Sequence, residues 1–124
     1  MDFIRTKGQG PKRLQVEMLD PLMGPGQAAT AVAPITVSPS GLSCNAELFV
    51  GPNETTKSAT SGMIAFSSTG VAQSVRLPII MPAVGGIAYH VYLDVYADSA
   101  LIVSYIATED VIIPSGSVGP IVWE

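Results

Sequence analysis

The amino-acid sequence predicts an all-β protein, an antiparallel β-sandwich of about seven short strands. In several stretches, apolar and polar residues alternate with a period of two, which is typical of strands with one buried face. Turn sequences rich in Gly and Pro separate these stretches at intervals of roughly 8–12 residues. No helix of useful length is expected, so the 124 residues should form one sandwich domain.

The longest of these stretches, residues 86–113, is expected to form one long β-hairpin. Its apolar face consists of odd-numbered residues in both halves: Ile87, Tyr89, Val91, Leu93, Val95, Leu101, Val103, Tyr105, Ala107 and Val111. Because directly opposed residues of a hairpin share a face, this parity requires an odd number of loop residues. A three-residue loop, Asp98-Ser99-Ala100, is therefore predicted.

The other expected strands are residues 12–19, 28–37, 42–50, 63–66 and 71–81, and residues 57–61 are expected to be a loop or a short edge strand. Pro34 and Pro78 cannot donate a ladder hydrogen bond, so the strands that contain them should be edge strands or bent. Cys44 shares a face with Leu42 and Ala46, which predicts a buried, non-functional thiol.

The chain divides into an extended basic arm (residues 1–11), the sandwich (12–113) and an apolar tail (114–124) that is expected to dock onto something. Four basic residues stand against one acidic residue in the first thirteen positions, which gives this part a charge of +3. The rest has two basic and nine acidic residues and a charge of −7. This acidic body and the few cations of the arm argue against a nucleic-acid partner.

Composition favours a multimer. Charged residues make up 13% of the chain, against roughly 25% in an average domain. Some apolar surface should therefore be covered by other subunits, although a mainly apolar, thermostable monomer is the alternative. No signal peptide and no membrane span are visible, so the protein is expected to be made in a cytoplasm unless a leader has been removed.

Catalysis is not expected, because His90 is the only histidine and Cys44 the only cysteine. Zinc requires several such ligands, and no glycine-rich phosphate loop precedes a helix, so neither a metal nor a cofactor is predicted. The remaining possibility is Ca²⁺ held by Asp94, Asp98, Glu109 and Asp110 at one sheet end, with solvated carboxylates as the simpler interpretation.

The even-numbered face of the hairpin carries a polar and aromatic stripe of four residues: His90, Tyr92, Asp94 and Tyr96. Aromatic residues on a solvated face favour a protein interface, and a sugar-binding platform is a second possibility. A third is that a loop or the tail buries this face within the domain. The candidate interface residues of the whole chain are Phe3, Ile4, Arg5, Lys7, Lys12, Arg13, His90, Tyr92, Tyr96 and Trp123.

The order of the expected strands and turns along the chain resembles that in immunoglobulin-like domains of the cell-adhesion-related bacterial (CARDB) type. The resemblance lies in the strand 47–51, an edge region after it, and a late Gly-x-x-Tyr-x-Val-x-Leu-x-Val strand that starts at Gly86. It implies an immunoglobulin-like sandwich over about residues 28–113. The sequence also resembles small immunoglobulin-like proteins encoded in phage and uncultured-bacterial genomes, a resemblance that implies a virion component.

The sequence therefore predicts a non-enzymatic structural protein that assembles with itself or on a larger lattice such as a capsid. A capsid decoration or tail protein of a phage is the concrete form, and a carbohydrate- or cell-surface-binding module is the alternative. In this hypothesis the arm lies across an acidic neighbouring subunit, with Phe3 and Ile4 for affinity and its cations for orientation. Deletion of residues 1–11 should weaken assembly and leave the sandwich folded.

Overall fold

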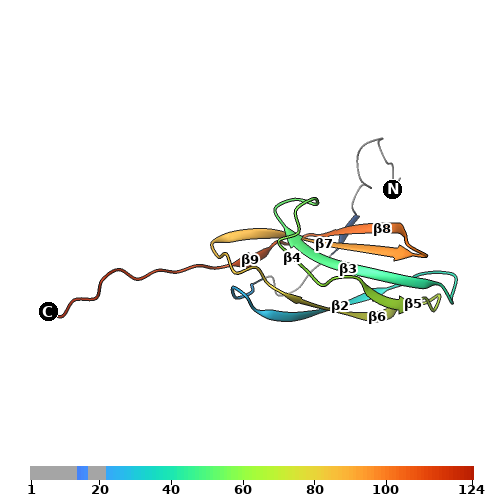
Figure 1. Cartoon of the computed structure of the whole chain (residues 1–124), viewed down its shortest axis with the longest axis horizontal. Coiled ribbons are helices and arrows are strands. Elements are labelled where there is room, and N and C mark those ends of the chain that lie inside the picture. The colour runs from blue at the N-terminus through green and yellow to red at the C-terminus, as the bar shows by residue number, and fades with distance from the viewer. Residues whose placement is uncertain (1–13, 17–21) are drawn as a thin grey trace.

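The computed structural model describes residues 14–16 and 22–124. In this part of the chain two β-sheets pack face to face and no helix is present, which confirms the predicted all-β sandwich (Figure 1). The immunoglobulin-like character of the sandwich stays a prediction. The arm (residues 1–11) and most of the expected first strand (12–19) lie outside the described residues.

The larger sheet has the strand order β1-β8-β7-β3-β4, with β5 also paired to β3 and β9 to β7. Its strands are β1 (Leu14–Val16), β3 (Ser43–Gly51), β4 (Ala59–Thr60), β5 (Ile64–Ser67), β7 (Ile87–Ala97), β8 (Ala100–Ala107) and β9 (Val111–Ile113). Strand β1 is parallel to β8, and the other pairs are antiparallel. The smaller sheet is the antiparallel pair of β2 (Ala28–Ile35) and β6 (Gln73–Ile80).

The described part of the chain thus has nine strands where about seven were expected. One addition is β4, which forms within the polar residues 57–61 as the short edge strand that the sequence allowed. The other is β9, where the expected hairpin is interrupted after β8 and then pairs with the start of β7. At the start of the predicted strand 71–81 the prediction was wrong, because Val71 is exposed and β6 begins at Gln73.

The hairpin has the predicted parity but not the predicted loop. Val95 pairs with Val103, and both belong to the core or pack against it. Ala97 pairs with Ala100, so the loop has only two residues, Asp98 and Ser99, both with positive φ. Such a two-residue turn matches the twist of the flanking strands. The extra residue that the parity requires is accommodated instead by a β-bulge in β8.

The core lies between the two sheets and consists of alternate residues from their strands. From the larger sheet it takes Cys44, Ala46, Val50 and Val95, among others, and from the smaller sheet Val75, Leu77 and Ile79. Burial of Cys44 is as predicted. The two prolines also lie where expected, since Pro34 and Pro78 belong to a two-stranded sheet in which each strand has one open edge.

Candidate interaction surfaces

The predicted aromatic stripe lies on the outer face of the larger sheet, beside a matching row on β3. The cross-strand pairs are Asn45 with Tyr96, Glu47 with Asp94, Phe49 with Tyr92, and Gly51 with His90. Tyr92 is only 4% exposed and Asp94 is also buried, whereas His90 and Tyr96 are half-buried. The stripe is therefore not a continuous solvated surface.

Phe49 and Tyr92 form the centre of this outer face. Their rings stack with centroids 5.0 Å apart, and Nζ of Lys57 lies 4.8 Å from the centroid of the Phe49 ring. Phe49 is 1% exposed although its strand position points away from the core between the sheets. In the alternation of residues 42–50, Phe49 lies on the face opposite Cys44 and Ala46, for which the sequence alone indicates solvent. The alternation does not reveal the stacking on Tyr92 or the position of Lys57.

Two carboxylates, Glu47 and Asp94, lie directly opposite each other in the next row of the outer face. Nζ of Lys57 lies 2.7 Å from one carboxylate oxygen of Glu47, and the hydroxyl of Thr60 donates to the other at 2.6 Å. Ser104 lies opposite Asp94 on β8 and is fully buried. Its hydroxyl oxygen has no hydrogen-bond partner among the described residues. Buried polar groups without partners are costly, so this hydroxyl is a local weakness in the sheet.

His90 contacts a carboxylate from the connection between β8 and β9. Its Nδ1 lies 2.7 Å from Oδ1 of Asp110, and both side chains are substantially exposed. A solvent-exposed pair of this kind contributes little to stability. It fixes the side-chain position of His90 and offers no nucleophile for it to activate.

The four carboxylates considered for Ca²⁺ do not gather at one sheet end. Asp98 lies in the β7–β8 turn, Asp94 lies opposite Glu47, and Asp110 contacts His90 near the opposite end of β7. Among the described residues no three His, Cys, Asp or Glu side chains are placed to hold a metal ion.

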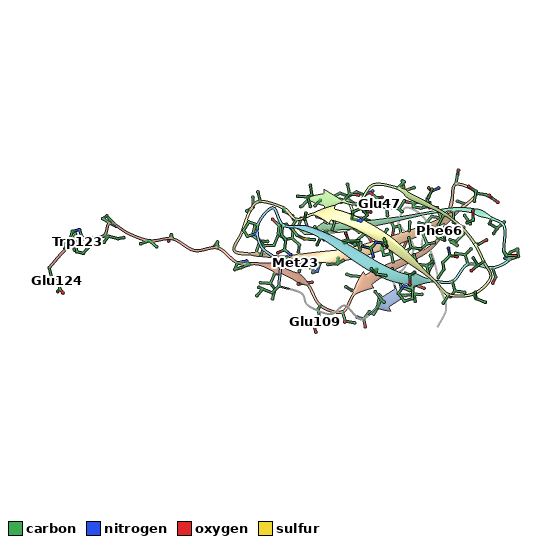
Figure 2. The ribbon with its side chains drawn as sticks, turned by 90° about the horizontal axis from the view of Figure 1, so that it is seen from below. Met23, Glu47, Phe66, Glu109, Trp123 and Glu124 are labelled. Carbon is green, nitrogen blue, oxygen red and sulfur yellow. The ribbon has the colours of Figure 1, made fainter. Side chains whose placement is uncertain are left out.

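The apolar tail extends away from the sandwich. Figure 2 shows Trp123 and Glu124 at its far end, remote from both sheets. Trp123 is 96% exposed, and Val118, Ile121 and Val122 are almost as exposed. Residues 114–124 belong to no strand. Of the predicted interface residues, Trp123 is thus fully accessible. Phe3, Ile4, Arg5, Lys7, Lys12 and Arg13 lie outside the described residues.

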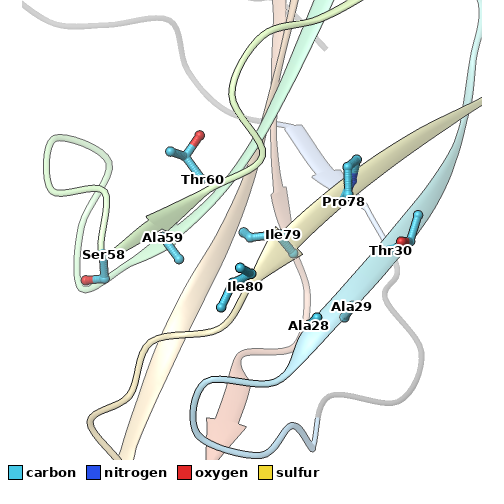
Figure 3. A pocket seen from close by; sticks show the side chains of 9 residues that line it. All are labelled: Ala28, Ala29, Thr30, Ser58, Ala59, Thr60, Pro78, Ile79 and Ile80. Atoms are coloured by element: carbon cyan, nitrogen blue, oxygen red, sulfur yellow. The ribbon is translucent and has the colours of Figure 1, made fainter.

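A groove opens where β4 approaches β6, and no motif of the sequence predicts it. Figure 3 shows its lining by Ala28, Ala29, Thr30, Ser58, Ala59, Thr60, Pro78, Ile79 and Ile80. Its volume is about 560 Å³, and no charged or titratable side chain lines it. It therefore offers apolar contact and no acid–base chemistry. Only the edge prolines and the small residues of β2 and β4 could have pointed to this site.

Comparison of the chain with protein-family models, with curated proteins and with solved structures finds no match. The resemblance to the CARDB-type domain therefore stays a prediction. In the described ranges, no helix has the length and apolar character needed to cross a membrane.

Proposed function

We propose that this protein is a non-enzymatic structural protein that works by assembling with copies of itself or on a larger protein lattice. The observation that carries the proposal is the tail, in which an apolar run ending at Trp123 makes almost no contact with its own domain. Exposed apolar clusters mark interaction sites, and tryptophan is enriched among the residues that dominate binding energy.

The low charge of the chain supports the same function. Charged residues make up 13% of the sequence, and the described surface also exposes apolar residues outside the tail: Leu22, Val32, Met63, Ile80 and Val84. Burial of such residues against neighbouring subunits removes apolar area from water, which is the main driving force of association. Assembly would thus lower the free energy of a chain with so many exposed apolar residues.

The concrete form that we propose is a phage virion component, either a capsid decoration protein or a tail protein. It is supported by the resemblance of the sequence to small immunoglobulin-like phage proteins, and by a two-sheet sandwich from which the tail projects. In such particles many copies occupy a repeating lattice. Mass spectrometry of purified particles should then find the chain in a fixed, multiple copy number.

The carbohydrate-binding alternative is not favoured by the geometry of its platform. A sugar stacks on an exposed aromatic face, but Tyr92 is 4% exposed and is stacked on Phe49. Tyr96 is only half-buried, yet it lies four residues further along β7, and the buried Tyr92 leaves no pair of open rings for a sugar.

Sedimentation equilibrium of the full chain over a wide concentration range tests the proposal. We expect masses well above the 12.9 kDa of the monomer, and a shift of the association to higher concentration in Trp123→Ala. Val71→Ala, which truncates an exposed residue outside the tail, is the matched control and should behave as the unmodified chain. A mass of 12.9 kDa at every concentration, with no binding to purified particles, would contradict the proposal.

A further inference from the structure

We infer that the tail of one copy docks along the open edge of β6 in a second copy and fills the groove between β4 and β6. This inference rests on the proposed assembly function and names the two surfaces that meet. Strand β6 pairs only with β2 among the described strands, so its other edge has no strand partner, although β4 and β5 lie close to it. An open edge is a template for pairing with another extended segment.

The groove matches an apolar, uncharged ligand. All nine lining residues are neutral, and six of them are Ala, Pro or Ile. In Figure 3, β6 runs between β4 and β2, and Ile80 stands beside the groove. Ile80 is 65% exposed, so its side chain is accessible to a partner that enters the groove.

The tail has the complementary properties. Residues 114–123 contain no charged side chain, and the segment is extended without pairing to any described strand. Residues 114–124 are enough to run along the eight residues of β6. Addition of an extended peptide to a sheet edge is a common mode of recognition, with main-chain hydrogen bonds for affinity and side-chain pockets for specificity.

A proline on each side of this contact limits the main-chain bonding. Pro78 removes one donor from the edge of β6, and Pro120 removes one from the tail. The tail itself becomes the new edge strand, where a proline is tolerated. Side-chain burial in the groove therefore contributes more to the affinity than the hydrogen-bond ladder, and we assign the anchor role to Ile121 and Trp123.

A second copy is the partner because the tail is directed away from its own domain (Figures 1 and 2). Its eleven residues can span at most about 36–40 Å, which is enough to cross to a neighbouring sandwich. Tail and groove are different surfaces, so the contact is heterologous, and each copy both gives a tail and receives one. Repetition of such a contact produces a ring or a filament.

The test uses two variants that are each defective in one half of the contact. The first lacks residues 117–124 but retains Pro114 and Ser115, which pack against Gly85. The second is Ile80→Arg, which places a charge in the groove. Val71→Arg is the control, because Val71 is equally exposed (64%) and does not line the groove. Thermal unfolding of each variant checks that it is folded.

In analytical ultracentrifugation, we expect each defective variant alone to associate at least about 30-fold more weakly than the full chain. A mixture of the two should form a one-to-one complex, because one supplies the intact tail and the other the intact groove. Val71→Arg should associate normally. If the full chain associates and both variants do so equally well, the tail–groove contact is wrong while assembly stands. If the mixture forms no complex, the tail binds elsewhere, and if the full chain never associates, both proposals fail.

Discussion

Replacement of Phe49 by Ala tests whether the outer face of the larger sheet is a buried, stabilising layer. The ring is 1% exposed, stacks on Tyr92 at 5.0 Å and carries Nζ of Lys57 at 4.8 Å from its centroid. Truncation of a buried Phe costs about 3–5 kcal/mol, from lost transfer free energy and the cavity left behind. We expect a loss of about 3–4 kcal/mol, which corresponds to a fall in Tm of about 10–15 °C for a domain of this size.

Urea unfolding followed by far-ultraviolet circular dichroism measures this loss, with an unchanged m-value as the sign that the unfolding transition is still comparable. Ile102→Ala is the control, because Ile102 is the exposed bulge residue of β8, and it should cost less than about 1 kcal/mol. A loss below about 1 kcal/mol for Phe49→Ala would mean that the ring is solvated and that the outer face is the open stripe suggested by the alternation.

A double-mutant cycle separates the ring contact from simple burial. Phe49→Leu and Tyr92→Leu keep most of the apolar volume, so their coupling reports the stacked pair. We expect a coupling free energy of about 0.5–1.5 kcal/mol. Additive effects of the two replacements would show that the rings do not interact beyond their burial.

Three further outcomes follow from the same geometry. Lys57→Met should lower the free energy of unfolding by about 1–2 kcal/mol in urea titrations, because it removes the cation that pairs with buried Glu47. The 43% exposure of Lys57 keeps this loss below that of a fully buried ion pair. An unchanged free energy of unfolding would refute the role of Lys57. Ser104→Ala should raise the stability by up to about 1 kcal/mol, since it removes a buried hydroxyl without a partner, and a marked loss would instead reveal a hydrogen bond. Cys44 should react with a thiol reagent only after unfolding, and rapid labelling of the native protein would contradict its burial.

The parity of the central hairpin could be predicted because the core imposes it. Val95 and Val103 face the other sheet, and a slip by one residue would turn the apolar face of either strand to solvent. The loop could not be predicted from parity alone. A turn of two residues and a bulge satisfies the same parity as a loop of three, and the twist of the strands favours the shorter turn.

The edge positions of Pro34 and Pro78 were also predictable, since a proline cannot donate within a ladder. The burial of Phe49 and Tyr92 was not, because it involves contacts between distant parts of the chain: the two rings stack across β3 and β7, and Nζ of Lys57 lies over the Phe49 ring. Period-2 alternation distinguishes the two faces of a strand but does not state what covers each face.

The candidate interaction site, too, could be predicted only in part from the sequence. An apolar tail ending in Trp123 was expected to dock, and the structure leaves its residues from Val118 onward exposed. Its proposed receptor required the spatial meeting of β4 and β6, which are separated by β5 in the sequence. The part assigned to the basic arm lies outside the described residues, and its effect on assembly stays a prediction.

The most direct measurement of assembly through the tail uses the intrinsic fluorescence of Trp123. It is the only tryptophan of the chain, so its emission reports the tail alone. At low concentration, where the protein is monomeric, a 96% exposed indole should be fully accessible to a soluble quencher. As the concentration rises and the mass increases, we predict a blue shift of the emission and protection from the quencher. Assembly with Trp123 as accessible as in the monomer, or no assembly at all, would contradict the account.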